Sequence, residues 1–325
     1  MGLPTHRQQH PDRRTSHVLL PIVGFFSQST QDFVLGTLDN LQEIGWEAEV
    51  MDRLVLDVEE KRMLQGLVEQ HHTRDKTGHR GDLFKGKGEE LIILLHGPPG
   101  VGKTLTAEML AETVQRSLMA LSVGDIIQNE YELDKTLKRF FSEATDWDAI
   151  LLLDEADVVL EARSLEDVRR NGIVSVFLRH LEYFKGVLIL TTNRLSTMDV
   201  AFQSRIQICV EFKELDKQNR MQIWLKLLEL KNSAKTISAE HLREVKRNIK
   251  TLAKYNLNGR QIRNVLNVAD GYAFNEFREA GKMEYRHIRN AANAAREFQR
   301  SMENAKSKTG AEQSVWAPYR GGDDF

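Results

Sequence analysis

The sequence predicts an α/β fold in which a five-stranded parallel sheet, flanked by helices, is followed by a small all-helical domain. Three observations carry this prediction. Short apolar runs alternate with helical patterns between about 85 and 213, a glycine-rich motif joins the first run to a helix, and from 214 the pattern becomes wholly helical. A chain of 325 residues, 41% of them hydrophobic, is long enough to bury both cores.

The apolar runs have the length and the branched side chains typical of strands that are buried on both faces of a parallel sheet. Their sequences are LIILLHG, LMALSVG, AILLLDE, GVLILTTN and RIQICVEF. Between them, TLTAEMLAETVQRS and LDKTLKRFFSEA have the apolar spacing of helices. The last run contains the single cysteine, Cys209, which we expect to be a buried structural thiol.

These patterns divide the chain into five segments. We expect a disordered tail over 1–17, a lead-in and linker over 18–84, the α/β domain over 85–213, a helical lid over 214–303 and a disordered tail over 304–325. In the lead-in, VLLPIVGFF suggests an extended stretch, whereas FVLGTLDNLQEIGW and LVLDVEEKRMLQGLVEQ suggest helices. The lid shows two apolar stripes, formed by Met221, Trp224, Leu227 and Leu228 and by Ile262, Val265, Leu266 and Ala269.

Composition and charge argue against several classes of protein. The formal net charge is −2, which gives no support for a nucleic-acid partner. The longest apolar runs are far shorter than the roughly twenty residues that a membrane-spanning helix needs, so we expect no membrane span. No apolar signal core follows directly on the basic N-terminal stretch. We therefore expect an intracellular protein, cytoplasmic by default, with the nucleus and the mitochondrion as open alternatives.

The strongest motif is GPPGVGKT, which follows a predicted strand and begins a predicted helix. Its glycines let backbone N–H groups point inward at phosphates, with the positive end of the helix dipole behind them. Lys103 would contact the β- and γ-phosphates, and Thr104 would place its hydroxyl on Mg²⁺. A plain turn between strand and helix would need neither residue. We expect ATP to contact Gly97, Pro98, Pro99, Gly100, Val101, Gly102, Lys103, Thr104 and Leu105.

A second motif, AILLLDE, is an apolar strand that ends in two acids. Asp154 would hold Mg²⁺ through its water shell, and Glu155 would orient and deprotonate an attacking water. The alternative is a solvated strand end. A small-molecule kinase has less use for an acid that activates water, so the pair favours hydrolysis of the nucleotide. We thus expect an ATPase with ATP and Mg²⁺ as cofactors.

The motifs GPPGVGKT, LLLDEAD, TTNR and AFQSRI, at these spacings, closely resemble the AAA ATPases of the AAA+ superfamily over about 85–269. The letters D-E-A-D also name a superfamily of RNA helicases. Those helicases have a phosphate loop of another composition, a Ser-Ala-Thr motif and a second RecA-like domain, none of which is visible in this sequence. Further stretches resemble a mainly fungal, poorly characterised AAA subgroup with a long N-terminal region, most of which we expect to be missing here.

The resemblance assigns roles to further residues. It implies that Asn193 acts as sensor 1 and that Arg205 is an arginine finger for a neighbouring subunit; the alternatives are a strand-end cap and a surface salt bridge. Arg260 or Arg263 would be sensor 2, the alternative being solvated helix arginines. The resemblance also implies a homo-oligomeric ring, hexameric in this superfamily, that acts on an unidentified protein client.

Two functions remain open from the sequence. The first is ATP hydrolysis coupled to conformational remodelling of a macromolecule, and the second is a nucleotide-gated assembly protein with little turnover. In the stretch from Ser122 to Phe141, where related unfoldases carry a pore loop, the only aromatic residue before the next predicted helix is Tyr131, flanked by Glu130 and Glu132. Flanking carboxylates resist the burial that gripping a polypeptide requires. We therefore expect remodelling without threading a chain through the ring.

Overall fold

The computed structural model describes residues 22–27, 32–47, 50–77, 90–122, 133–161, 168–195, 198–278 and 282–315. The chain forms two compact units, 1–46 and 47–325, which are treated separately.

In the first unit, β1 (Ile22–Ser27) pairs with β2 (Asp32–Thr37) in an antiparallel hairpin, and a short 3-10 helix, η1 (Leu38–Asn40), follows. The helix expected over FVLGTLDNLQEIGW is therefore wrong. Its first residues belong to β2, where Val34 lies opposite Phe25 in the register of the two strands. Aromatic and β-branched residues facing each other across two strands favour a hairpin over a helix.

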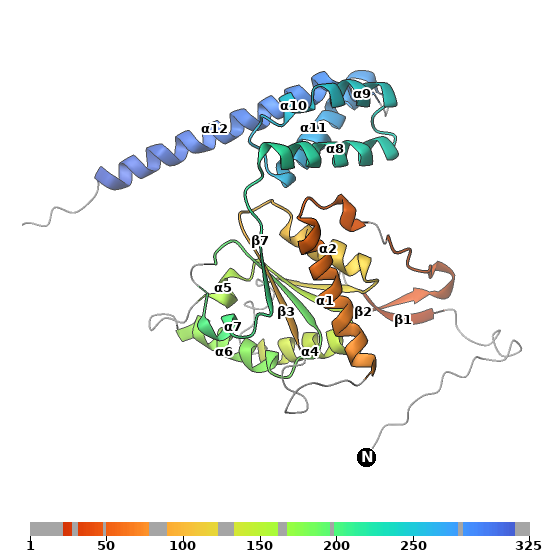
Figure 1. Ribbon diagram of the computed structural model, residues 1–325, viewed down its shortest axis with the longest axis vertical. Coiled ribbons are helices and arrows are strands. Elements are labelled where there is room, and N and C mark those ends of the chain that lie inside the picture. The colour runs from red at the N-terminus through yellow and green to blue at the C-terminus, as the bar shows by residue number, and fades with distance from the viewer. Residues whose placement is uncertain are drawn as a thin grey trace, which may run out of the picture. The chain divides into compact units, whose positions relative to one another are not determined.

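The second unit contains the predicted five-stranded parallel sheet, with the strand order β4-β5-β6-β3-β7. All five apolar runs form strands, so the predicted α/β fold is confirmed. Figure 1 shows the strands side by side with helices on both faces of the sheet. The strands are β3 (Leu91–His96), β4 (Leu118–Ser122), β5 (Ile150–Asp154), β6 (Val187–Thr192) and β7 (Ile208–Glu211).

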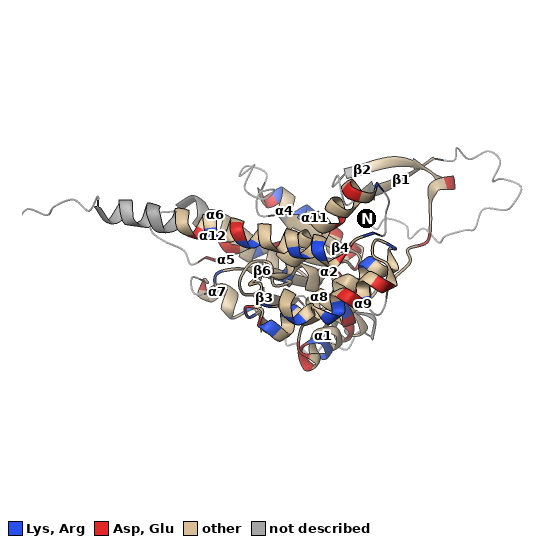
Figure 2. Cartoon of the chain, turned by 90° about the horizontal axis from the view of Figure 1, so that it is seen from above, with Lys and Arg blue, Asp and Glu red and all other residues tan. Residues whose placement is uncertain are grey.

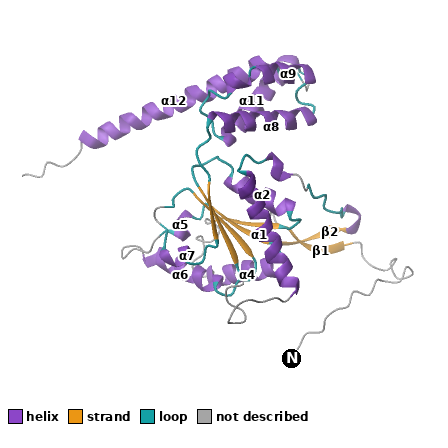
Figure 3. Cartoon of the chain, viewed as in Figure 1, coloured by secondary structure: helices purple, strands orange, loops and turns teal. Residues whose placement is uncertain are grey.

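Alternating side chains of the central strands enter two separate cores. On β3, Ile92 and Leu94 pack into the cluster that includes residues of α4 and α6, whereas Leu91, Ile93 and Leu95 pack with residues of α1 and α2. Successive residues of a strand point to opposite faces, so a strand covered on both sides is apolar throughout. The helices, shown in Figure 3, are α1 (Val58–Thr77), α2 (Lys103–Thr113), α4 (Leu133–Asp146), α5 (Asp157–Leu160), α6 (Val168–Leu181) and α7 (Val200–Gln203).

Cys209 departs from the expectation of a buried thiol, because its side chain is exposed. The residue lies on β7, which is at the edge of the sheet and pairs with β3 alone. Its neighbour Val210 is buried and points to the opposite face. The apolar sequence of this strand predicted burial on both of its faces, but only the face that carries Val210 is covered.

Apart from one isolated β-bridge between Ile237 and Lys282, the described residues of the lid form helices and the loops that connect them, as predicted. Trp224 and Leu228 of the first stripe and Ile262 and Leu266 of the second pack into one buried cluster. The final helix continues to Val315, past position 304 where the sequence suggests the start of a disordered tail. The lid helices are α8 (Lys217–Ser233), α9 (Ala239–Arg247), α10 (Ile249–Leu252), α11 (Gly259–Phe277) and α12 (Tyr285–Val315).

Figure 2 shows basic and acidic residues interspersed along the helices. None of the helices in the described part of the chain combines the length and the apolar composition that a membrane-spanning helix needs.

Candidate nucleotide site

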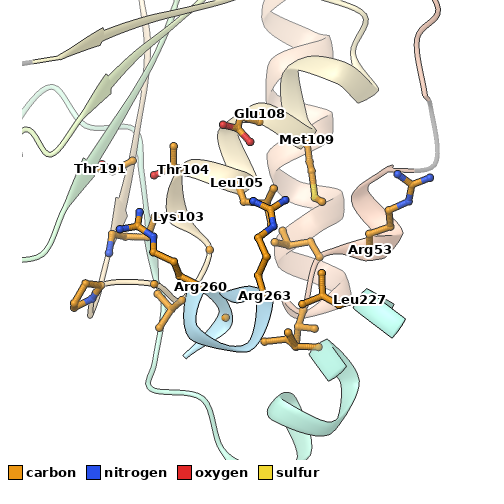
Figure 4. A pocket seen from close by; sticks show the side chains of 18 of the residues that line it. Arg53, Lys103, Thr104, Leu105, Glu108, Met109, Thr191, Leu227, Arg260 and Arg263 are labelled. Atoms are coloured by element: carbon orange, nitrogen blue, oxygen red, sulfur yellow. The ribbon is translucent and has the colours of Figure 1, made fainter. Parts of the chain in front are cut away.

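A cavity of about 330 Å³ lies at the start of α2, between the carboxyl ends of the strands and the lid (Figure 4). In a parallel α/β sheet this edge is where ligands bind, because loops and helix N-termini converge there. Gly97 and Pro98, which the sequence also places at the nucleotide, are not among the residues that line the cavity. Most of the other residues expected at the site do line it. They are Pro99, Gly100, Val101, Gly102, Lys103, Thr104, Leu105, Asp154, Glu155, Asn193 and Arg260.

The glycines of the loop before α2 are required by its backbone. Gly97 has φ +141°, and a Cβ placed there would lie 2.0 Å from the backbone oxygen of Phe212. Gly100 has φ +77°, and its Cβ would lie 2.6 Å from the side chain of Asn258 in the lid. Any residue with a side chain would be strained at both positions. The loop can therefore pass close to β7 and to the lid.

Lys103 is the first residue of α2 and its ammonium group is buried in the site. Its Nζ donates to the backbone oxygens of Gly97 (2.7 Å) and Pro98 (2.8 Å) and to Oδ1 of Asn193 (2.9 Å). Burial lowers the pKa of Lys103, while the carboxylates of Asp154, Asp157 and Glu155 act to raise it. The structure thus brings the predicted phosphate lysine and the predicted sensor 1 amide into contact.

The residues that could hold a metal ion form a compact oxygen cluster. Thr104 Oγ1 donates to both carboxylate oxygens of Asp154, at 3.0 and 3.1 Å. Thr191 also donates its hydroxyl to Asp154. A hydroxyl and a carboxylate are the hard oxygen ligands that Mg²⁺ prefers, so the residues present fit this cation. Thr191 was missed because a threonine inside an apolar strand carries no signal of its own.

Glu155 follows Asp154 in an unusual backbone conformation. Its φ is +53°, which is uncommon for a residue with a side chain. Its backbone N–H donates to Thr191 Oγ1 at 2.9 Å, which fixes the turn. The side chain is exposed at the cavity rather than buried in the sheet. Backbone strain of this kind collects at functional sites, where it places a side chain where the chemistry needs it.

Asp157 has a second role besides starting a helix. The helix α5 begins at this residue. Its Oδ1 also accepts a hydrogen bond from the backbone N–H of Asn193 at 3.0 Å and another from the hydroxyl of Thr192. Asp157, the final residue of the D-E-A-D sequence, therefore connects the segment after β5 to the end of β6, next to Asn193.

The lid contributes two arginines to the cavity. Figure 4 shows the side chains of Arg260 and Arg263 extending from the start of α11 toward α2, and both line the cavity. Arg260 is close enough to Lys103 for its charge to act to lower the pKa of that lysine. Asn258, which caps α11, donates from Nδ2 to the backbone oxygen of Pro99 at 3.3 Å. The lid therefore contacts the glycine-rich loop directly.

Arg205 is not among the residues that line the cavity. Its guanidinium donates from Nη2 to Glu182 Oε1 at 3.1 Å and from Nη1 to the backbone oxygen of Ala201 at 2.9 Å. Within one chain, the arginine therefore forms an ion pair. A role at a neighbouring subunit stays a prediction. Tyr131 lies outside the described residues.

The end of the cavity opposite the phosphate loop comes from segments that the sequence analysis did not assign to the nucleotide site. It is lined by Arg53, Leu54 and Val55 at and just after a 3-10 helix, η2 (Val50–Arg53), by Glu108 and Met109 of α2, and by Ile223, Lys226, Leu227 and Leu230 of α8. Lys226 donates to the backbone oxygens of Asp52 and Leu54, the latter at 3.0 Å. The mainly apolar walls suit a flat heterocycle.

The central part of the chain matches a known protein family. Residues 93–214 match the model of the ATPase family associated with various cellular activities (AAA). This segment is an AAA ATPase domain. The match runs from within β3 to just past β7 and includes the phosphate loop, the two acids, Asn193 and Arg205. The resemblance to AAA proteins stated from the motifs is therefore confirmed at the level of the domain.

Three relatives show what the chain is similar to. ATPase family AAA domain-containing protein 3B of Homo sapiens is 31% identical over 146 residues, which are 42% of this chain and 22% of that protein. Fidgetin-like protein 1 of Drosophila melanogaster is 25% identical over 213 residues, 62% of this chain and 39% of that protein. Spastin of Naegleria gruberi is 29% identical over 144 residues, 40% of this chain and 28% of that protein. The matched part is well under half of each relative, and these diverse AAA proteins support no particular subgroup.

Proposed function

We propose that this chain is an ATP-binding and ATP-hydrolysing module that couples hydrolysis to conformational remodelling of a macromolecular partner. The observation that carries the proposal is that one cavity combines the ammonium of Lys103, the hydroxyl–carboxylate cluster of Thr104 and Asp154, and the exposed carboxylate of Glu155. Phosphate binding, metal binding and water activation each need one of these groups.

Each residue has a defined step in the proposed reaction. The backbone N–H groups of the loop and Lys103 bind the phosphates, and Thr104 with Asp154 would hold Mg²⁺, which neutralises phosphate charge when bound. The amide of Asn193 orients a water molecule against the γ-phosphate. Glu155 takes the proton of that water as its oxygen bonds to phosphorus, and the bond to ADP breaks, which releases ADP and phosphate.

The decisive experiment replaces the proposed base. Glu155→Gln keeps the shape of the side chain but cannot accept the proton, so ATP should bind as in the parent while kcat falls by about 10²-fold or more. Binding is measured with a fluorescent ATP analogue, and phosphate release gives the rate. Glu214→Gln, at an exposed acid outside the cavity, is the matched control. Hydrolysis by Glu155→Gln at the parental rate would show that Glu155 is not the base.

A second candidate is a nucleotide-gated assembly protein with little turnover. The ion pair of Arg205 with Glu182 favours it, because an arginine held within its own chain must leave that partner before it can reach a neighbour's phosphate. The two candidates bind ATP equally and differ in rate. If the chain assembles with ATP but the rate of phosphate release per subunit does not rise with protein concentration, the second candidate would be favoured.

We also propose that the active form is a homo-oligomeric ring in which Arg205 completes the neighbour's site. Arg205→Ala subunits should bind ATP and hydrolyse it slowly. Mixing them with Glu155→Gln subunits should restore part of the activity, because a subunit with intact Glu155 can then lie beside one with intact Arg205. Unchanged activity of Arg205→Ala alone, or a chain that stays monomeric with ATP at every concentration tested, would contradict the ring.

The client and the grouping within the family are also proposals. Remodelling without threading rests on the acidic neighbours of Tyr131 in the sequence. ATP-dependent loss of fluorescence from a tightly folded, tagged reporter, abolished by Tyr131→Ala, would contradict it. The proposal that this chain belongs to the mainly fungal AAA subgroup rests on stretches such as GKGEELIILLHGPPGVGKTLTAEMLAE. A phylogeny that separates this chain from those proteins would overturn that grouping.

A further inference from the structure

The lid contains a second cavity, of about 470 Å³, formed where α10 and the loop after it face α12. Its lining includes three cations and one carboxylate, and its remaining side chains are polar. Among the described residues, no ion pair includes Lys254 or Arg300. The lining consists of Thr251, Lys254, Tyr255, Asn256, Arg296, Gln299, Arg300 and Glu303.

One of the three cations is already held in a fixed position. The guanidinium carbon of Arg296 lies 5.4 Å from the centre of the Tyr255 ring, and its Nη2 donates to Asn293 Oδ1 at 3.3 Å. The Tyr255 hydroxyl donates to the same Oδ1 at 2.7 Å. A guanidinium stacked on an aromatic ring keeps its N–H edge available and loses little further entropy when it binds an anion.

We propose that this lid cavity binds a small polyvalent anion of the phosphate type, such as a phosphate ester or a diphosphate. Two guanidiniums and one ammonium from two separate elements surround it, and Glu303 offsets only one of the three charges. Guanidinium and ammonium groups around an anion form charge-assisted hydrogen bonds. The site is distinct from the nucleotide cavity, because no residue lines both.

The wall of the lid cavity is bonded to the glycine-rich loop through side-chain amides. Gln299 donates from Nε2 to the backbone oxygen of Asn256 at 3.1 Å and to Gln261 Oε1 at 3.2 Å. Gln261 and Asn258 form the reciprocal cap of α11, in which each side chain accepts from the other's backbone N–H at 2.9 Å. Asn258 in turn donates to the backbone oxygen of Pro99 at 3.3 Å.

This chain of contacts gives the anion an effect on the nucleotide site. An anion that joins the guanidinium of exposed Arg300 to the fixed one of Arg296 restrains Gln299, which lies between them on α12, and thereby stabilises the cap of α11 against the phosphate loop. The N–H of Gly259, at the start of α11, donates to the backbone oxygen of Gly100 at 2.9 Å, so the same docking has a second contact. Because a stabilised cap supports the phosphate loop, occupancy of the lid cavity raises nucleotide affinity, and by reciprocity a bound nucleotide raises the affinity for the anion by the same factor. This second step rests on the proposed nucleotide binding.

Binding is tested with inorganic diphosphate as the probe. Since the phosphate loop also attracts diphosphate, the titration uses the full chain carrying Lys103→Ala, in which that loop is disabled. Adding Lys254→Gln and Arg300→Gln should weaken binding roughly tenfold. Adding Arg289→Gln, at an exposed arginine of α12 that does not line the cavity, should leave it unchanged.

Coupling is tested separately in chains that keep Lys103. The apparent Kd of ADP is measured with and without diphosphate in the parent and in Gln299→Ala, which keeps all three cations. Competition at the phosphate loop is common to both chains and cancels in the comparison of their ratios. The parent should gain about fivefold in affinity relative to Gln299→Ala.

The outcomes separate the two proposals. Diphosphate binding that is lost with Lys103→Ala alone places the probe in the phosphate loop, which overturns the lid site and leaves nucleotide binding supported. Binding that persists without Lys103 and ignores Lys254→Gln and Arg300→Gln also overturns it. Equal ratios in the parent and Gln299→Ala overturn the coupling. An absence of ADP binding in the parent contradicts the proposed function, while the titration of the lid cavity still stands on its own.

Discussion

The two ends of the nucleotide cavity are built in different ways. The phosphate end comes from one continuous loop and the strand ends beside it, and its atoms are joined by hydrogen bonds that include backbone oxygens. The opposite end, here called the base end, combines η2, α2 and α8 and is mainly apolar. Phosphate chemistry demands particular atoms at fixed spacing, whereas an apolar wall demands only shape and area. Substitutions at the phosphate end should therefore abolish function, while those at the base end should tune it.

The largest effect is expected at Gly97. In Gly97→Ala the new Cβ would overlap the backbone oxygen of Phe212 and the residue would have to keep φ at +141°, so we expect a loss of about 3 kcal/mol or more in the free energy of unfolding. Urea denaturation measures it. Gly66→Ala is the control, because nothing lies within 4 Å of a Cβ at Gly66 in α1; it should stabilise the chain slightly. Equal stability of both variants would mean that the loop has another conformation.

The next largest effect is expected for Lys103→Ala. It removes the ammonium proposed to contact the phosphates, and we expect the Kd of ATP to rise about 100-fold, equivalent to about 3 kcal/mol. Titration with a fluorescent ATP analogue measures the change. Lys213→Ala, at an exposed lysine outside the cavity, provides the comparison. A Kd that stays within twofold of the parental value would show that the phosphates of ATP do not bind at this loop.

A smaller effect is expected at Asp157, which positions the loop of Asn193 without lining the cavity. Asp157→Ala leaves the N–H of Asn193 without its acceptor and removes one of the two acceptors of the Thr192 hydroxyl, so we expect kcat to fall about tenfold with little change in KM. Asp157→Asn keeps one acceptor oxygen and should recover most of the rate. If both variants raise KM and leave kcat unchanged, Asp157 acts on binding instead.

The smallest effect is expected at the base end. Leu227→Ala removes part of an apolar wall, and we expect KM for ATP to rise about fivefold, near 1 kcal/mol, with kcat unchanged. Val268→Ala, at an exposed position of the lid, is the control. A loss in kcat as large as that of the phosphate-end variants would remove the distinction between the two ends.

The same contrast explains what the sequence could predict. The phosphate loop has a fixed spacing because its backbone, the ammonium of Lys103 and the hydroxyl of Thr104 must all reach one phosphate chain. A short stretch of sequence that begins at Gly97 therefore identifies the loop. Leu54 and Leu227 are far apart in the chain and look like ordinary core residues. Met109 had the one usable signal, since it lies one helical turn after Leu105. The fold followed from periodicity, but Cys209 shows that an apolar run does not reveal an edge strand.

The contact of Lys226 with the segment before α1 has a consequence for how this protein can vary. Its ammonium binds the backbone oxygens of Asp52 and Leu54, and every residue type carries such an oxygen. The side chain of exposed Asp52 is therefore free to change during evolution without loss of the contact. At 226 only a long side chain with a terminal donor can span the gap. Among homologues that keep this arrangement, position 226 should be restricted to lysine or arginine, while position 52 drifts.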